Sequence, residues 1–218
     1  MSATNRRLNN RMMKLYLIRH GQTTHNAGGK HQGWGPIRLS EKGMEQARTA
    51  RSYLSALKLD KIYASPLLRT RQTAEFIFPD EYHRGLITFS DDLREVDTGP
   101  LSKYYVKDLD VRWGEEYTKR RRDMDLTPYG IESSAVVRAR AAHFLETVLA
   151  DAEAENLESI AVVLHAGIIR AMLTEICGLP AEIPLGRLPF EIDNCSVTTL
   201  EYGMLGWRIR GVNYQVNR

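Results

Sequence analysis

Two histidines and two arginines in this sequence stand where a phosphoryl group could be bound and attacked. Arg19 and His20 come directly after one continuous apolar run, and His165 comes directly after another. Arg69 lies about one turn beyond a third strand-like segment. Guanidinium groups match the oxygens of a phosphate dianion, and an imidazole can donate to such a group or attack its phosphorus. These four side chains therefore favour phosphoryl chemistry, provided that the fold brings them together.

The elements that must position these side chains alternate between strands and helices. Short, mainly apolar runs predict strands at residues 15–18, 61–64 and 160–164. Apolar residues at steps of three and four predict helices at residues 41–57, 66–76, 137–152 and 168–176. Ser40 is a good N-cap, and Ser65-Pro66 offers a cap and a first-position proline. Two strand-like runs separated by glycines predict a terminal hairpin at residues 197–202 and 207–212.

This alternation predicts the fold class and the place of the site. Strands that alternate with helices imply a mostly parallel sheet with helices on both faces, so we expect a single-domain α/β three-layer sandwich. In an open parallel sheet, ligands bind beyond the carboxyl ends of the strands. All four side chains follow predicted strands, so we expect them at that edge. The polar residues 97–130 interrupt the alternation and predict a short insertion over the C-terminal edge of the sheet.

The composition is that of an ordinary globular protein and argues against several partners. Its 218 residues suffice for one sizeable domain, expected at residues 13–218 after a disordered N-terminal arm at residues 1–12. A formal net charge of +3 does not favour nucleic acid. Cys177 and Cys195 suit a reducing compartment, and no run resembles a membrane helix or a secretory signal. We therefore expect a cytoplasmic protein with no nucleic-acid or membrane partner.

Four motifs follow one another along the chain, each beside the end of a strand-like segment. They are Arg19-His20-Gly21-Gln22-Thr23-Thr24-His25-Asn26, Ser65-Pro66-Leu67-Leu68-Arg69-Thr70-Arg71-Gln72-Thr73-Ala74-Glu75, Leu93-Arg94-Glu95 and Leu164-His165-Ala166-Gly167-Ile168-Ile169-Arg170. Weaker flanking motifs are Gly130-Ile131-Glu132-Ser133 and Asn194-Cys195-Ser196-Val197. Together these motifs resemble those of the histidine phosphatase superfamily, also called phosphoglycerate-mutase-like. The resemblance covers the chain from about Lys14, and four motifs in the family order are a specific signal.

The resemblance implies a role for each residue that matches a motif. His20 would be the nucleophile. Glu95 would be the general acid that protonates the leaving oxygen and then the base that activates water. Arg19, Arg69 and His165 would hold the phosphoryl oxygens. The phosphate pocket or the substrate mouth would be lined by Asn26, Gln32, Gly33 and Ala166.

The residue types are consistent with this chemistry. A histidine nucleophile must be neutral to attack. Flanking arginines disfavour the imidazolium and stabilise the charge that develops at phosphorus. The identity of the general acid is less firmly specified, because Asp97 is a nearby rival of Glu95 and Asp91 and Asp92 are more distant ones. The motif match favours Glu95.

Departures from the family pattern bear on the substrate. Pro36 and Arg38 stand where many members have Asp and Pro, and residues 99–102 lack the family's aromatic and Trp-Glu-Gly residues. The segment between Glu95 and Glu132 is shorter than the substrate-enclosing segments of glycolytic mutases, which must exclude water. We therefore expect a phosphatase acting on a phosphate monoester, with a small phosphorylated metabolite favoured over a phosphoprotein. The alternative is a cofactor-dependent phosphotransferase of the phosphoglycerate mutase type.

Two further readings and one basic run complete the hypotheses. A metal hydrolase would use four histidines, namely His20, His25, His31 and His165. Their spacing fits no compact zinc motif and nearby arginines repel cations, so we expect neither a metal nor another cofactor. A non-catalytic binding module conflicts with the complete set of motif residues. The basic run 119–122 predicts a solvated helix face; alternatively, with Arg38, it rims the pocket and favours substrates with extra negative charge.

Overall fold

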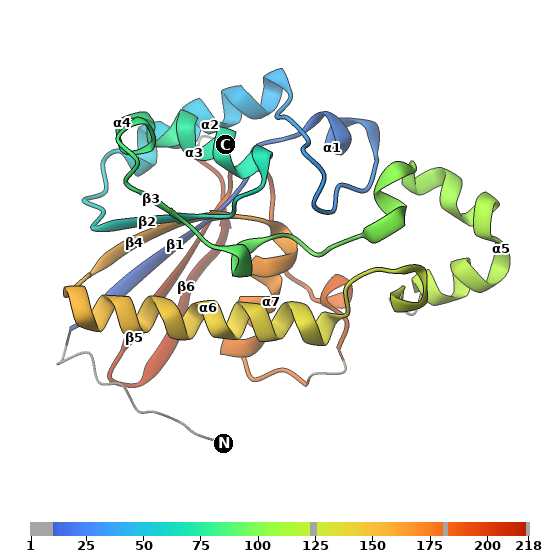
Figure 1. Cartoon of the computed structure of the whole chain (residues 1–218). Coiled ribbons are helices and arrows are strands. Elements are labelled where there is room, and N and C mark those ends of the chain that lie inside the picture. The colour runs from blue at the N-terminus through green and yellow to red at the C-terminus, as the bar shows by residue number, and fades with distance from the viewer. Residues whose placement is uncertain (1–10, 123–125, 181–182, 217–218) are drawn as a thin grey trace.

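The computed structural model describes residues 11–122, 126–180 and 183–216. Within these residues a six-stranded sheet runs through the middle of the molecule, in the order β3-β2-β4-β1-β5-β6 (Figure 1). The strands are β1 Met13–Arg19, β2 Lys61–Ala64, β3 Ile87–Phe89, β4 Ser159–Leu164, β5 Val197–Gly203 and β6 Gly206–Tyr214. The first four in this order pair in parallel, whereas β5 runs antiparallel to both β1 and β6. The predicted terminal hairpin is thereby confirmed.

Helices form a layer on each face of the sheet (Figure 1). One layer contains α2 Glu41–Leu54, α3 Leu68–Ile77 and α4 Pro79–His83. The other contains α6 Ser134–Glu155 and α7 Ala166–Ile176. Successive side chains of β1 point to opposite faces of the sheet. Leu15 and Leu17 pack in the core on the side of α6 and α7. Tyr16 and Ile18 pack in the core on the side of α2 and α3. The predicted three-layer α/β fold is confirmed.

The register of the central strands brings the sequence motifs together. β1 and β4 pair from Lys14 opposite Ser159 to Arg19 opposite Leu164. Both strands therefore end at the same level, and the backbone N–H of His20 donates to the Leu164 carbonyl oxygen at 2.9 Å. His20 and the residue after Leu164 leave the same edge of the sheet side by side.

The helix after β2 begins later than predicted. α3 starts at Leu68, so the expectation that Ser65 caps a helix with Pro66 in its first position is wrong. A proline disfavours helical geometry in the residue before it. The Ser65 N–H accordingly donates to the Val163 carbonyl oxygen at 3.0 Å and prolongs the strand ladder. The Ser65 hydroxyl oxygen lies 2.9 Å from His165 Nε2 and also accepts from the Leu67 N–H at 3.4 Å.

The remaining differences concern short elements and element ends. The helix predicted at residues 41–57 ends at Leu54, although its predicted cap is confirmed because the Ser40 side chain accepts from the Gly43 N–H. Among the elements that were not predicted are the short α1 Thr24–Gly28, α4 and β3. β3 has three residues, of which only Ile87 is buried, so it carries no apolar pattern long enough to detect.

Residues 97–130, hereafter the insertion, flank the site at the carboxyl ends of the strands, as predicted. Their main element is α5 Val106–Arg122, which bends at Gly114 where φ is 72°. Figure 1 shows α5 projecting to one side of the sheet. Three fully buried side chains give it a small core: Leu101, Leu109 and Tyr117. Trp113 and Tyr129 stack beside them with ring centroids 5.2 Å apart. A polar segment thus stays folded around an aromatic cluster of its own.

Two predictions concern the N-terminal arm and the cellular location of the protein. Most of the predicted N-terminal arm lies outside the described residues, so its disorder stays a prediction. Of its last residues, Arg11 pairs with Glu158 at an N–O distance of 3.7 Å. Among the helices of the described ranges, none combines the length and apolar character needed to cross a membrane. The cytoplasmic location also stays a prediction.

Candidate active site

His20 leaves the carboxyl end of β1 and is buried, with 2% of its surface exposed. Its Nδ1 lies 2.7 Å from the carbonyl oxygen of Gly21. A carbonyl oxygen can only accept a hydrogen bond, so Nδ1 carries the ring proton and Nε2 keeps its lone pair. The backbone therefore holds the ring in the tautomer whose Nε2 can act as a nucleophile.

The surroundings of His20 favour its neutral form. Burial is the largest cause that lowers the pKa of His20 well below 6.5, and the positive charges of Arg69 and Arg19 lower it further. The pKa of His165 is lowered in the same direction, first by burial and then by Arg69. Both imidazoles are thus neutral over the range in which a free histidine titrates.

We expect the rings of His20 and His165 to stay neutral when the pH is lowered through 6.5. His143 should behave in the opposite way, because its hydrogen bond to Asp92 raises its pKa. NMR titration of the histidine rings between about pH 5 and pH 8 tests this contrast. The unfolded chain would bind protons that folded His20 and His165 do not, so the free energy of unfolding should fall as the pH drops below about 6.5. A His20 ring that titrates at 6.5 or above would contradict the neutral nucleophile.

Arg19 and Arg69 each combine a hydrogen-bonded guanidinium nitrogen with a buried nitrogen that has no partner among the described residues. Arg19 Nη1 donates to the Ile192 carbonyl oxygen at 2.6 Å, and Arg69 Nη2 donates to the Gly33 carbonyl oxygen at 2.9 Å. The buried Arg19 Nε and Arg69 Nη1 have no partner among the described residues. Burial lowers the pKa of Arg69 to about 10, which leaves it charged at neutral pH. Buried donors normally find acceptors, and phosphoryl oxygens would supply them here.

His165 lies beside His20 in the site. Its ring centroid is 5.2 Å from that of His20, at an interplanar angle of 60°. Its Nδ1 accepts from Arg69 Nε at 3.3 Å, so Nε2 carries the proton and donates to the Ser65 hydroxyl at 2.9 Å. His165 is fully buried and is absent from the described residues that line the cleft. In this arrangement it orients Arg69, and its contact with a phosphoryl oxygen stays a prediction.

Glu95 reaches the same cleft from the loop before the insertion. Its Oε1 accepts from the Val96 N–H at 2.9 Å, and its Oε2 accepts from the Gly167 N–H at 3.4 Å. The space for this carboxylate exists because residue 167 has no side chain. A Cβ built on Gly167 would lie only 2.2 Å from Glu95 Oε1 and 2.8 Å from Val96 Cγ2.

The Gly167→Ala substitution should therefore displace Glu95. Alanine is normally a better helix former than glycine, but at this position in the first turn of α7 the added methyl group would overlap the carboxylate. We expect a loss of about tenfold or more in kcat/KM for esters with poor leaving groups, since proton transfer depends on the placement of the acid. Gly211→Ala is the control, because nothing lies within 4 Å of its added Cβ. Unchanged activity in Gly167→Ala would show that Glu95 does not need this position.

All four predicted substrate-contacting residues line one cleft, which has a volume of about 590 Å³. They are Asn26, Gln32, Gly33 and Ala166. Asn26 Oδ1 accepts from the Thr23 N–H at 3.1 Å, and Gln32 Oε1 accepts from the Thr23 hydroxyl at 2.9 Å. The Gly33 carbonyl oxygen holds Arg69, as described above. The structure thus brings these residues together with His20 and Glu95, whereas their contacts with a substrate stay predictions.

Apolar side chains make up a substantial share of the cleft lining. The walls of the cleft come from the insertion, the start of α6 and the 3₁₀ turn Leu185–Arg187. The apolar lining residues are Val96, Leu126, Ile131, Val137, Pro184 and Leu185. Besides Arg19 and Arg69, the described Lys and Arg side chains that line the cleft are Lys30 and Arg170. The apolar lining residues suit the organic part of a substrate better than a second phosphate group.

Several residues that hold the site were not predicted. Trp34 Nε1 donates to the Glu95 carbonyl oxygen at 2.7 Å, and Asn194 Nδ2 donates to the His20 carbonyl oxygen at 2.9 Å. Asn194 belongs to one of the weaker flanking motifs, so the sequence did point to it, although without a role. Trp34 stands between two glycines without any apolar pattern, and nothing in the sequence connects it to a residue 61 positions away.

The basic run does not join the described lining of the cleft. Arg120 Nε pairs with Glu116 at 2.8 Å, and Arg121 Nη2 pairs with Asp110 at 2.5 Å. Arg38 is exposed and is likewise absent from the described lining. The side chain of Arg122 lies outside the described residues, so the hypothesis of a basic rim stays a prediction.

The metal reading depended on four histidines. Two of them, His20 and His165, lie together, whereas His25 is held through Nδ1 by the His31 carbonyl oxygen at 3.2 Å. In the described part of the chain, no group of three or more His, Cys, Asp or Glu side chains is placed to hold a metal ion. The charged side chains beside His20 are instead guanidinium groups.

Comparison with known families identifies the chain. The model of the histidine phosphatase superfamily (branch 1) matches residues 15–215. This chain belongs to that superfamily. The resemblance drawn from the four motifs is thereby confirmed. Among curated relatives, a 2,3-bisphosphoglycerate-dependent phosphoglycerate mutase of Brucella canis is 35% identical over 173 residues, which cover 77% of this chain and 83% of the mutase.

Solved structures of the superfamily share the fold over nearly the whole chain. An alpha-ribazole phosphatase from Shigella flexneri is similar with a TM-score of 0.80 and 25% identity, covering 93% of this chain and 97% of its own. A mycobacterial glucosyl-3-phosphoglycerate phosphatase solved with VO3 has a TM-score of 0.77 and 28% identity, covering 93% and 99%. Superfamily membership and these relatives support an enzyme of the phosphatase or phosphotransferase type.

Proposed function

We propose that this protein hydrolyses a phosphate monoester through a phosphohistidine formed on His20. The observation that carries the proposal is the hydrogen bond between His20 Nδ1 and the Gly21 carbonyl oxygen, which leaves the lone pair on Nε2, in a cleft shared with two arginines that have unpaired donors among the described residues. His20, the two arginines and the Glu95 carboxyl group line the same cleft, which supports phosphoryl transfer without a metal. The substrate would be a small phosphorylated metabolite.

The first step transfers the phosphoryl group to the protein. His20 Nε2 attacks phosphorus, a P–N bond forms, and the P–O bond to the leaving alcohol breaks. Arg19 Nε and Arg69 Nη1 would bind the phosphoryl oxygens as their charge develops. Glu95, in its protonated form, would give its proton to the leaving oxygen.

The second step returns the protein to its starting state. Glu95, now a carboxylate, would take a proton from a water molecule whose oxygen attacks phosphorus. The P–N bond breaks, inorganic phosphate leaves, and His20 Nε2 regains its lone pair. The Gly21 carbonyl oxygen supports both steps, because it keeps the Nδ1 proton in place while Nε2 gains and loses the phosphoryl group.

The volume of the cleft and its apolar lining residues favour hydrolysis of a bulky ester. A volume of about 590 Å³ lies within the range of pockets for ligands much larger than a three-carbon acid. Apolar side chains contribute to the lining of the cleft, which supports a substrate with an apolar organic part. Both solved relatives described above are named as phosphatases, which supports the same reading.

The second candidate is a phosphoglycerate mutase-type phosphotransferase. The observation in its favour is the 35% identity to the Brucella canis mutase, which exceeds the identity to either phosphatase structure. A mutase would pass the phosphoryl group from His20 back to the bound acceptor, with water excluded. Lys30 and Arg170 are the cleft cations available to an acceptor's carboxylate.

Product analysis in EDTA separates the candidates. The protein would be given aryl phosphates of increasing apolar size and, separately, 3-phosphoglycerate with and without 2,3-bisphosphoglycerate. Hydrolysis predicts phosphate release that survives EDTA and a kcat/KM that rises with the size of the aryl group at matched leaving-group pKa. Conversion of 3-phosphoglycerate to its 2-isomer without phosphate release would establish the mutase instead. Loss of all activity in EDTA would point to a metal enzyme.

A further inference from the structure

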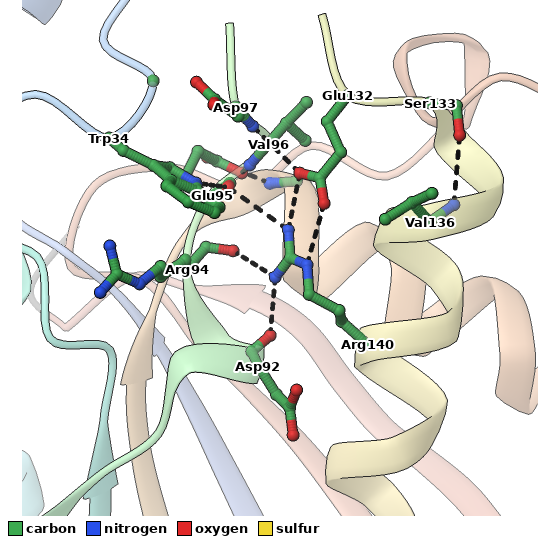
Figure 2. A network of polar contacts seen from close by, with 12 residues as sticks. Trp34, Asp92, Arg94, Glu95, Val96, Asp97, Glu132, Ser133, Val136 and Arg140 are labelled. Atoms are coloured by element: carbon green, nitrogen blue, oxygen red, sulfur yellow. Dashed lines mark hydrogen bonds and ion pairs between the residues drawn. The ribbon is translucent and has the colours of Figure 1, made fainter. Parts of the chain in front are cut away.

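We propose that the ion pair between Glu132 and Arg140 positions the carboxyl group of Glu95 for proton transfer. The inference rests on the proposed function, because it assumes that Glu95 is the general acid and base. Neither residue lies in a described contact with the Glu95 carboxylate, so the pair would act through the backbone that carries it. Figure 2 shows this network.

The Arg140 guanidinium holds the loop that ends at Glu95. Its Nη1 donates to the carbonyl oxygens of Asp92 and Arg94, each at 2.9 Å. Its Nη2 also lies 3.5 Å from the carbonyl oxygen of Glu95. One side chain of α6 thus gathers three carbonyl groups from four consecutive residues. The direction in which the Glu95 side chain leaves the loop depends on these contacts.

Glu132 completes the arrangement from the other side. Its Oε1 accepts from Arg140 Nε at 3.0 Å, and its Oε2 accepts from Arg140 Nη2 at 2.7 Å. The same Oε2 accepts from the Asp97 N–H at 3.0 Å, and the Glu132 N–H donates to the Asp97 carbonyl oxygen at 2.8 Å. The pair therefore fixes the chain both before and after Glu95 (Figure 2).

The burial of the pair makes it more specific than a surface ion pair. The side chains of Arg140 and Glu132 are 18% and 12% exposed. All three guanidinium nitrogens are used, and the two toward Glu132 form a bidentate fork. Lysine has a single ammonium group and cannot reproduce this fork while it reaches two further carbonyls. Even a conservative substitution should loosen the loop.

Trp34 links this loop to the phosphoryl end of the cleft. Its Nε1 donates to the Glu95 carbonyl oxygen at 2.7 Å, opposite the Arg140 contact. The preceding residue, Gly33, accepts from Arg69 Nη2. Glu95 and Arg69 are therefore both hydrogen-bonded to the same short loop, at Trp34 and Gly33. A shift of about 1 Å in such a group can cost on the order of 10²-fold in rate.

An ion pair that only stabilises the fold would show different mutant kinetics from one that positions Glu95. Loss of a stabilising pair lowers stability and affects all substrates alike. Loss of the correct acid position harms esters whose leaving oxygen needs a proton and spares those with good leaving groups. The dependence of kcat/KM on leaving-group pKa therefore separates the two roles, provided that folding is monitored in parallel.

The test compares Arg140→Lys and Glu132→Gln with wild type, Glu95→Gln and the double variant Glu95→Gln/Arg140→Lys. Arg138→Lys is the matched control, because Arg138 lies two residues earlier on α6, pairs with Glu175, and donates to the Pro180 and Leu179 carbonyl oxygens. We expect Arg140→Lys to lose about tenfold to 10²-fold in kcat/KM on alkyl phosphates and much less on dinitrophenyl phosphate. Adding it to Glu95→Gln should cause no further loss. Arg138→Lys should lower the melting temperature without any leaving-group dependence.

The outcomes separate this inference from the proposed function. If Glu95→Gln shows leaving-group dependence while folded Arg140→Lys and Glu132→Gln lose activity equally on all esters or not at all, the positioning role is wrong and the proposed function stands. Additive losses in the double variant would also overturn it. If Glu95→Gln itself shows no such dependence, the assignment of the acid fails and the inference fails with it.

Discussion

His20→Ala should lower kcat for any phosphate ester by about 10⁴-fold to 10⁶-fold, the scale seen when a covalent nucleophile is removed. Alanine has no lone pair to form the P–N bond, and the arginines and Glu95 cannot supply one. The fold should survive, because among the described residues the His20 side chain hydrogen-bonds the carbonyl oxygen of its neighbour Gly21 and does not tie distant elements together. Steady-state kinetics with an aryl phosphate, together with circular dichroism, measure both expectations.

The matched control for this prediction is His83→Ala. His83 lies at the end of α4, its side chain is 66% exposed, and its removal should leave kcat unchanged. A folded His20→Ala variant that kept near-normal turnover would eliminate His20 as the nucleophile. Loss of the native circular dichroism spectrum in His20→Ala would instead call for His20→Gln, which keeps more of the side-chain volume.

Glu95→Gln should separate esters by their leaving groups. An amide cannot donate a proton to the leaving oxygen as a carboxylic acid does, so kcat/KM for alkyl phosphates should fall by about 10²-fold to 10⁴-fold. Dinitrophenyl phosphate leaves without protonation, so its kcat/KM should change little. Its kcat should still fall, because attack of water on the phosphohistidine needs the same carboxylate. A burst of dinitrophenol followed by slow turnover is therefore expected in rapid mixing.

Asp97→Asn is the control for this prediction. Asp97 is the rival carboxylate in the sequence, but its Oδ1 accepts from the Gly99 N–H at 2.9 Å and it is absent from the described lining of the cleft. We expect it to show no dependence on the leaving group. Equal losses of kcat/KM on both kinds of ester in Glu95→Gln would show that another group is the acid.

The sheet and its main helices could be predicted because their patterns are local. The runs in β1 and β4 are apolar throughout, since helices cover both faces, and such runs are read directly from the residues. α3 was misplaced at its start because Ser65-Pro66 matches a helix-start pattern as well as the end of a strand. Only the pairing of Ser65 with Val163 across the sheet decides between the two. β3 was missed because two of its three residues are exposed.

The side chains that line the cleft were easier to predict than the residues that hold them in place. Arg19, His20, Arg69 and Glu95 follow strand ends within recognisable motifs, and the structure places all four at one cleft. Arg140 acts on backbone carbonyls more than 40 positions away, and such contacts leave no residue pattern. The tautomer of His20 was equally hidden, because it depends on a backbone carbonyl rather than on a side chain.

The most direct measurement is the capture of the covalent intermediate. The protein would be mixed rapidly with a radiolabelled phosphate ester and quenched in alkali, where phosphohistidine survives, and the labelled peptide would be identified by mass spectrometry. We predict phosphate on the His20 imidazole within the first turnover, more of it in Glu95→Gln, and none in His20→Ala. Full turnover with no phosphorylated histidine, or with label on a different residue, would contradict the mechanism.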